Sequence, residues 1–412
     1  MMRRLCALAM ALAVAATGCS DSGDSGGSGG DLKFANWQWL EPGGRGDAIW
    51  SAVNGWRDPS GKLVKQAIPR KDYESTLQTQ MGQGRGPDIL VLPDTSFERF
   101  RKAGLLAPLD DVRPAGTALN RSNALTEVDG RRWAYTWEIV QYALFWNEDL
   151  LKKAGVRPPT DPAGLVAAAT AIKKRTGNPG FAVRHQLNEE TPWWIDFSNW
   201  PYGFGGAWAR NGALTINDPN NVQALRTFKQ LYDSGAMPVG DDASTFRKRF
   251  ADGRLGMMID NSSALSTMVN GNKIVPGSKV GAGPLPFGTP GSSHVGVHLA
   301  LNKKSKRLAA ARKWLTWWLG PDGQRAAAAA LGASTIATDT PPPASFTTGN
   351  PWTAAFKKQA PASVSAVVPG FEAKTPQIAH VVLGQVESVL TKGTDPKAAL
   401  DRAQREAQEL AR

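Results

Sequence analysis

The chain has very little cysteine and histidine for its length. Its 412 residues include two cysteines, Cys6 and Cys19, and four histidines. Because both cysteines lie near the N-terminus, the rest of the chain has no disulfide bond and no thiolate metal site. The histidines are not spaced like the ligands of a metal-binding motif. We therefore expect neither a metal nor a cofactor.

Motifs of several common enzyme classes are also missing. The sequence has no HExxH motif, no phosphate-binding P-loop and no dinucleotide fingerprint. Gly82, Gly84 and Gly86 precede a predicted strand, whereas the glycines of that fingerprint follow one. We therefore predict that the protein is not an enzyme. A glycoside hydrolase stays open as an alternative, because it needs only two carboxylates among residues such as Glu138, Asp196 and Asp260.

Blocks of positive charge are absent as well. The formal net charge is +12, but the lysines and arginines are scattered along the chain. A nucleic-acid-binding protein is expected to gather basic residues on one face or along one helix. The charge pattern therefore argues against a nucleic-acid partner.

The apolar run near the N-terminus, residues 5–16, is too short to cross a bilayer, which takes about 20 residues. It follows two arginines and has the length of a signal-peptide core. The run ends at residues 16–19, Ala-Thr-Gly-Cys, which resemble the lipobox of bacterial lipoproteins. This resemblance implies a signal peptide at 1–18 and a lipid on Cys19. The alternative is a plain signal peptide that is followed by a chance cysteine.

Residues 19–30 are rich in glycine, serine and aspartate, a composition that cannot form a packed core. We expect a flexible tether with a root-mean-square span of about 20 Å. With a lipid on Cys19, the tether would hold the folded body near the extracellular face of the bacterial cell membrane.

Tryptophan, by contrast, is abundant. There are fifteen tryptophans, and four of them lie in the stretch TPWWIDFSNWPYGFGGAW at 191–208. Asp196 and Asn199 stand among these rings. Most tryptophans fill hydrophobic cores, but aromatic rings beside acids also suit a sugar, whose C–H faces stack on rings and whose hydroxyls bind carboxylates. The sequence alone leaves both roles open.

Strand-like and helix-like segments alternate from residue 31 onwards, which predicts an α/β architecture. The opening strand is expected over 31–39, and the apolar run in PDILVLPD is typical of a buried parallel strand. Asn147 is a predicted helix N-cap and Gly155 a predicted C-cap. A proline-rich crossover is expected over 339–351.

Six segments in a fixed order resemble family 1 extracellular solute-binding proteins of ABC importers, the group that contains maltose-binding protein. They cover most of residues 31–412. The segments are PDILVLPDTSFERFRKAGLLAPLDD, ALFWNEDLLKKAGVRPP, FRKRFADGRLGMMID, KVGAGPLP, LALNKKSKRLAAARKWLTWWL and DPKAALDRAQRE.

The resemblance implies a two-lobed periplasmic-binding-protein-like fold of type II. Each lobe would be a sheet flanked by helices, and the ligand cleft would lie between the lobes. Lobe 1 would comprise 31–137 and 289–335, and lobe 2 would comprise 138–288 and 336–412. The resemblance further implies a protein, expected to be a monomer, that captures a small solute and delivers it to the permease subunits of an ABC transporter.

Ligand groups in this family come from loops at the C-terminal ends of strands in both lobes. One of Trp193 and Trp194 is expected to stack on the ligand, while the other packs inward. Asp94 has an alternative role as a helix N-cap, and His298 has one as a structural imidazole. The candidate ligand residues implied by the resemblance are Trp39, Glu41, Asp94, Thr95, Trp137, Glu138, Trp193, Trp194, Asp196, Trp200, Asp260, Asn261 and His298.

Aromatic and acidic residues together favour a carbohydrate, either a mono- or an oligosaccharide. An anionic ligand would need converging arginines, and only Arg184 and Arg210 lie near the predicted cleft. A polyamine, a phosphorylated solute or a peptide stays open as an alternative. Two tryptophans of the maltose-binding branch are absent, one at 262–263 and one within 375–383, so the size of the sugar is open too.

Overall fold

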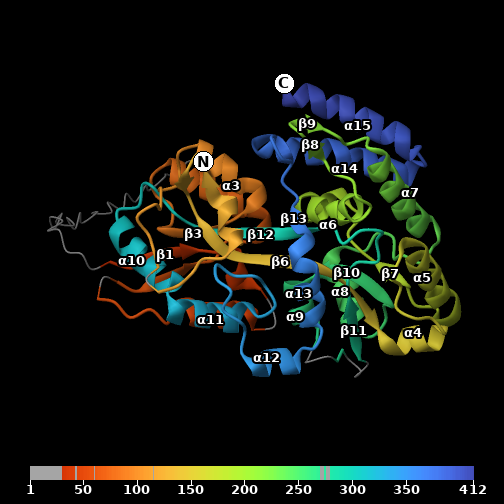
Figure 1. Cartoon of the computed structure of the whole chain (residues 1–412), viewed down its shortest axis with the longest axis horizontal. Helices are drawn as coiled ribbons and strands as arrows, with labels where there is room; N and C mark the ends of the chain where they lie inside the picture. Colours follow the sequence, from red (N-terminus) through yellow and green to blue (C-terminus); the bar gives the residue numbers. More distant parts are fainter. Residues whose placement is uncertain (1–29, 42–43, 60, 115, 270–272, 275–278) are drawn as a thin grey trace, which may run out of the picture.

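Figure 1 shows the computed structural model of the protein, which describes residues 30–41, 44–59, 61–114, 116–269, 273–274 and 279–412. The predicted signal peptide, Cys19 and all but the last residue of the predicted tether lie outside this part of the chain. Among the described residues, no helix is both long enough and apolar enough to span a membrane.

Most strands join in one path with the order β2-β1-β3-β12-β6-β10-β7. At one end of the path, β1 (Leu32–Ala35) pairs in parallel with β2 (Leu63–Gln66) and β3 (Ile89–Pro93). All residues of β3 are buried, as its continuous apolar run predicts. Side chains of five helices complete this hydrophobic core: α1 (Arg45–Val53), α2 (Tyr73–Gly82), α3 (Asp94–Lys102), α10 (Leu308–Leu319) and α11 (Pro321–Leu331).

Two long strands connect the halves of the molecule. They are β6 (Tyr135–Asn147) and β12 (Ser292–Leu301), which pair antiparallel through the centre of Figure 1. The chain crosses a third time between α11 and residue 352, where Thr335 exchanges backbone hydrogen bonds with Ile139 of β6. It then returns to the crossing strands at β13 (Ser363–Ser365), which pairs in parallel with the start of β12. We call the three crossings, together with β13, the hinge.

The other half is built on β10 (Met257–Asn261), β7 (Phe181–Ala182) and β11 (Val280–Gly283), which extend the sheet beyond β6. The core on one face of this sheet is formed with α4 (Glu148–Ala154), α5 (Pro162–Thr176), α6 (Glu190–Gly203) and α7 (Pro219–Asp233), and α14 (Thr375–Lys392) and α15 (Pro396–Ala411) cover α6 and α7. The opposite face packs on α8 (Ala243–Ala251), α9 (Ser262–Met268) and α13 (Thr353–Gln359).

Several shorter elements complete the described chain. The two-stranded pairs are β4 (Glu127–Val128) with β5 (Arg131–Arg132) and β8 (Ala209–Arg210) with β9 (Ala213–Leu214). Short 3-10 helices are η1 (Trp37–Leu40), η2 (Arg70–Asp72), η3 (Arg121–Thr126), η4 (Leu187–Glu189), η5 (Ala360–Ala362) and η6 (Glu372–Lys374).

Capping residues mark the helix ends as predicted. The side chain of Asn147 accepts hydrogen bonds from the backbone N–H groups of Asp149 and Leu150 at the start of α4. Gly155 ends α4 in the left-handed region, with a φ of 64°. Both assignments made from the sequence are confirmed.

Three segments differ from the expectation. The first strand ends at Ala35, because the side chain of Asn36 caps η1 by accepting from the N–H of Gln38. The proline-rich crossover contains α12 (Ala344–Gly349). Most of the tryptophan-rich stretch forms α6. The sheet and neighbouring helices, including the C-terminal ones, enclose α6, so its aromatic rings pack on several of its sides.

The hydrophobic cores lie on either side of the hinge, one around β1–β3 and the others around β10. This arrangement agrees with two lobes, each a sheet flanked by helices. The residue boundaries given above for the two lobes stay a prediction.

Candidate functional site

Asp94 stands where β3 ends and α3 begins, beside the hinge. Its Oδ1 accepts a hydrogen bond of 2.8 Å from the N–H of Thr95, and its Oδ2 accepts one from the hydroxyl of Ser365. A Cβ at Gly296 of β12 would lie 2.9 Å from Oδ2, so glycine allows the carboxylate to approach the strand closely. Asp94 thus joins the first lobe to β13.

The carboxylate of Asp94 is largely buried from solvent. Burial raises the pKa of Asp94 to about 6, although hydrogen bonds from Ser365, Thr95 and Gly296 act in the opposite direction. No lysine, arginine or histidine lies within ion-pair distance of Asp94 in the described chain. A buried carboxylate that lacks a cationic partner is unusual, because the charged form is poorly solvated.

A cavity of about 400 Å³ opens beside Asp94, and we call it the large cavity. This volume lies within the range of small-molecule sites. Its walls come from α3, the η3–β4 segment, β12 and the segment 365–372, which begins at the end of β13. The lining residues are Asp94, Phe97, Glu98, Leu125, Val128, His298, Ser365, Val367, Pro369 and Glu372.

His298 contributes an imidazole to the large cavity. Burial lowers the pKa of His298 to about 3, with a smaller effect from His294, so the ring is neutral at physiological pH. Its Nδ1 is buried and has no hydrogen-bond partner among the described residues. The ring of Phe97 meets it edge-on at a centroid distance of 5.4 Å. A buried ring nitrogen without a partner is a candidate ligand contact.

A small cavity of about 150 Å³ lies on the other side of α3. Its α3 residues, Thr95, Ser96 and Arg99, are turned away from Asp94, Phe97 and Glu98 by the 3.6-residue helical repeat. The starts of α6 and α14 supply the opposite wall, so both lobes contribute. The lining residues are Glu74, Thr95, Ser96, Arg99, Glu190, Thr191, Trp194, Thr375, Pro376 and Ala379.

A buried cluster of charges lies at the lobe 1 side of the hinge. Arg45 donates to Glu41 over 2.8 Å and to both oxygens of Glu138 over 2.9 and 3.2 Å. Glu138 also accepts from the Gln38 amide and, over 2.8 Å, from the Ser334 hydroxyl. The charge of Glu138 is therefore fully compensated.

A matching cluster lies in lobe 2, at the ends of β7 and β10. Arg184 donates to Asp196 over 2.7 Å, and the Tyr142 hydroxyl donates to the other oxygen of Asp196. Arg247 holds Asp260 in a bidentate pair at 2.7 and 2.9 Å.

Within the lobe 2 cluster, the pKa values of the two carboxyl groups are shifted in opposite directions. Burial raises the pKa of Asp196, and the positive charge of Arg184 only partly offsets this rise. For Asp260, burial is outweighed by the charge and hydrogen bonds of Arg247, so its pKa is lowered. Burial also raises the pKa of Glu41, and the positive charge of Arg247 in the facing lobe slightly opposes this rise. The clusters therefore face each other between the lobes.

The structure distributes the candidate ligand residues among four places. Asp94 and His298 line the large cavity, and Thr95 and Trp194 line the small one. The charged clusters contain Glu41, Glu138, Asp196 and Asp260, with Asn261 beside Asp260. The remaining candidates are buried in the cores: Trp39, Trp137, Trp193 and Trp200.

The paired tryptophans 193 and 194 differ in their surroundings. Trp193 is completely buried, whereas Trp194 donates its indole N–H to the Ala366 carbonyl over 2.8 Å and stacks on Trp208 at 4.6 Å. Trp194 reaches the small cavity and Trp193 lines neither cavity. That one of the two stacks on a ligand stays a prediction, and Trp194 has the better position.

Sequence reasoning missed Ser365, Arg45 and Arg247. Ser365 lies 271 residues from its partner Asp94, and Arg45 lies 93 residues from Glu138, so no local pattern joins them. Of the arginines noted near the cleft, Arg184 belongs to the lobe 2 cluster, whereas Arg210 forms an ion pair with Asp218 at the surface.

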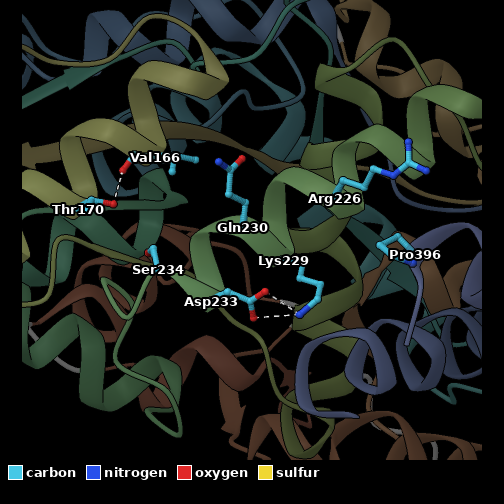
Figure 2. Close-up of a pocket in the computed structure, with 8 residues that line it drawn as sticks. All are labelled: Val166, Thr170, Arg226, Lys229, Gln230, Asp233, Ser234 and Pro396. Atoms are coloured by element: carbon cyan, nitrogen blue, oxygen red, sulfur yellow. Dashed lines mark hydrogen bonds and ion pairs between the residues drawn. The ribbon is translucent and has the colours of Figure 1, made fainter. Parts of the chain in front are cut away.

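An open depression of about 610 Å³ lies elsewhere, on the outside of the second half. Figure 2 shows its walls from α5 and α7, with the ion pair of Lys229 and Asp233 and the nearby Pro396. These groups belong to one half of the molecule, and the ion pair is an ordinary i,i+4 surface pair. We call this open depression the outer depression, and we do not assign the solute to it.

The residue types at these sites do not suggest a resident metal. Within the described ranges, no group of three or more histidine, cysteine, aspartate or glutamate side chains is arranged to hold a metal ion. The chemistry that the sites offer is hydrogen bonding, charge compensation and apolar contact.

Comparisons with known proteins agree with this architecture. The family model described as bacterial extracellular solute-binding protein matches residues 62–370. A binding protein of Brucella abortus (strain 2308) is 24% identical over 243 residues, which is 57% of this chain and 58% of the relative. The sn-glycerol-3-phosphate-binding periplasmic protein UgpB of the same strain is 25% identical over 238 residues, or 53% of this chain and 54% of the relative. The match thus spans little more than half the length of these relatives.

Solved structures extend the likeness over nearly the whole chain. The GacH receptor of Streptomyces glaucescens has a TM-score of 0.80 at 23% identity, and the match covers 93% of this chain and 98% of that one. Maltose-bound MalE3 of T. maritima also scores 0.80, at 22% identity over 92% of this chain and 100% of that one. The predicted two-lobed type II fold is confirmed. The chain is a member of the bacterial extracellular solute-binding protein family.

Proposed function

We propose that the protein captures a carbohydrate between its lobes and delivers it to the permease of an ABC importer. The large cavity carries this proposal, because it combines hydrogen-bonding groups with apolar walls. Asp94 and His298 can accept from hydroxyls, while Phe97, Val128 and Val367 offer surfaces for the C–H faces of a sugar. The protein GacH, similar in fold, was solved in complex with acarbose.

The lining of the large cavity disfavours a phosphorylated solute. None of its residues is lysine or arginine, and three are carboxylates. In the two charged clusters, each arginine already has a carboxylate partner, so an anion would have to displace a buried ion pair. UgpB of Mycobacterium tuberculosis, similar in fold at a TM-score of 0.75, was solved with glycerophosphocholine, so phosphorylated solutes belong in the test.

The same pairing argues against a glycoside hydrolase. Glu138, Asp196 and Asp260 are the carboxylates that such an enzyme would use, and each is held by an arginine. A nucleophile needs a free oxygen near the sugar, whereas both oxygens of each of these carboxylates already accept hydrogen bonds within the protein. We therefore propose a binding protein without catalysis.

The mechanism we propose is closure about the hinge. A solute that touches both lobes binds the closed form more tightly and shifts the population towards it. The closed form would then dock on the permease, with a lipid on Cys19 holding the monomer at the extracellular membrane face. No bond in the solute is made or broken.

A thermal-shift titration tests the proposal. The purified protein is screened with mono- and oligosaccharides, and with spermidine, sn-glycerol 3-phosphate and a short peptide as alternatives. A solute that binds only the folded state raises the melting temperature with the logarithm of its concentration. We expect a sugar to do so and the Asp94→Asn variant to show a smaller shift at the same sugar concentration. The matched control is Asp233→Asn in the outer depression, and a shift confined to the non-sugar solutes would refute the carbohydrate assignment.

A further inference from the structure

The large cavity is lined by acidic but not by basic residues, and the capture of a neutral sugar does not require this imbalance. Three of its ten lining residues are carboxylates, Asp94, Glu98 and Glu372, and none is a lysine or arginine. Glu98 is neutralised by Arg101, which holds both of its oxygens at 2.7 Å. Glu372 is only partly buried, so water still reaches its carboxylate, which accepts from the N–H of Gly370 at 2.7 Å. Of the three, Asp94 is the carboxylate that is buried and has no cationic partner among the described residues.

Asp94 differs from the other buried carboxylates between the lobes. Glu138, Asp196 and Asp260 each have an arginine partner, whereas the described chain places no cation on Asp94. Its donors are uncharged groups, the Ser365 hydroxyl and backbone N–H groups. Such a carboxylate is stabilised when a positive charge enters the cavity, because the charge replaces the solvation lost on burial.

His298 supplies a second acceptor near the first. It lies two residues beyond Gly296, the residue that Asp94 packs against, on the same face of β12 and about 7 Å along the strand. Its side chain is 1% exposed, and its Nδ1 has no partner among the described residues. A neutral imidazole nitrogen that is not protonated accepts a hydrogen bond.

We propose that the solute carries a protonated amine, which Asp94 and His298 bind together, so that the ligand is an amino-substituted carbohydrate. The inference rests on the proposed function and names the class of sugar. An ammonium group has three donors and one charge, whereas a hydroxyl has one donor and no charge. It therefore satisfies both acceptors and compensates Asp94. The ring of Phe97 adds a surface that attracts cations.

The test compares matched sugars that differ at one position. D-glucose, D-glucosamine and N-acetyl-D-glucosamine, and the corresponding galactose set, are titrated calorimetrically into the full protein at pH 7.5. We expect the amine to bind at least tenfold more tightly than the parent sugar, and N-acetylation, which removes the charge, to abolish the gain. Asp94→Asn should remove the preference. His298→Gln should reduce it while the melting temperature of the free variant confirms folding.

Asp233→Asn is the matched control, because it removes a carboxylate of the outer depression and leaves the large cavity unchanged. This variant should keep the preference. Equal binding of amine and parent sugar would overturn the inference and leave the proposed function standing, and so would a preference that survives Asp94→Asn. If only spermidine binds, the carbohydrate proposal fails and the charge assignment stands. If no member of any set binds, the inference is overturned.

Discussion

The buried charged cluster of lobe 1 predicts a large effect of one conservative substitution, Glu138→Gln. Glu138 is 1% exposed and accepts hydrogen bonds from Arg45, Gln38 and Ser334. The substitution keeps the shape of the side chain but removes its charge, and the amide presents a donor to groups that also donate. Arg45, whose side chain is 8% exposed, is left with Glu41 alone.

The magnitude follows from the burial of the pair. Removing one partner of a buried ion pair costs about 3–5 kcal/mol, because the other charge stays buried and uncompensated. Glu41 retains part of the compensation, so we expect the lower end, about 3 kcal/mol of unfolding free energy. The matched control is Glu41→Gln, in which a side chain that is 26% exposed is changed. Burial raises the pKa of Glu41, so the folded state disfavours its charge, and we expect its removal to cost about 1 kcal/mol or less.

Urea unfolding followed by tryptophan fluorescence measures both variants at pH 7.5. A lower midpoint with an unchanged slope reports a loss of stability rather than a change in the unfolded state. We expect Glu138→Gln to lose about 3 kcal/mol and Glu41→Gln at most about 1 kcal/mol. Equal losses, or a loss below about 1 kcal/mol for Glu138→Gln, would refute the reasoning that this ion pair is buried and indispensable.

Three further predictions concern pH, packing and capping. The pKa of Asp94 is raised to about 6 in the folded protein, so its contribution to stability is present below about pH 4 and is lost as the pH rises through 6. Compared with Asp94→Asn, the wild type should therefore lose about 2–3 kcal/mol of unfolding free energy between pH 4 and pH 7, and a pH-independent difference would contradict this. Trp193→Ala should lower the unfolding free energy, measured in urea, by about 3–5 kcal/mol because the ring is fully buried. Trp37→Ala changes a partly exposed ring and should lower it less, and the reverse order would contradict the packing described for Trp193. Asn147→Ala should cost about 1 kcal/mol by loss of the α4 cap, and no change in the thermal midpoint would exclude that role.

The parts of the fold that were predictable depend on local chemistry. The buried strand β3 follows from its uninterrupted apolar run, and the limits of α4 follow from Asn147 and Gly155. The two-lobed architecture was predictable only through the family resemblance that six segments in a fixed order carry. In contrast, α6 has apolar residues on most of its sides, so its sequence lacks the one-sided pattern by which a helix is recognised.

The candidate site was predictable only in part. Asp94, directly after β3, and Asp260, near the end of β10, lie beside the hinge between the lobes, as the general rule for open sheets indicates. The sequence could not tell that Asp260 meets Arg247 while Asp94 meets a serine of β13. These pairings depend on contacts between distant segments, and they decide which carboxylate stays available for a solute.

The most direct test of the central claim is a crystal structure of the protein grown with the sugar that raises its melting temperature most. The account predicts electron density for the sugar in the large cavity, with its polar groups on Asp94 and His298 and its C–H face on the apolar wall. Density in the outer depression of α5 and α7, with both cavities beside α3 empty, would contradict it.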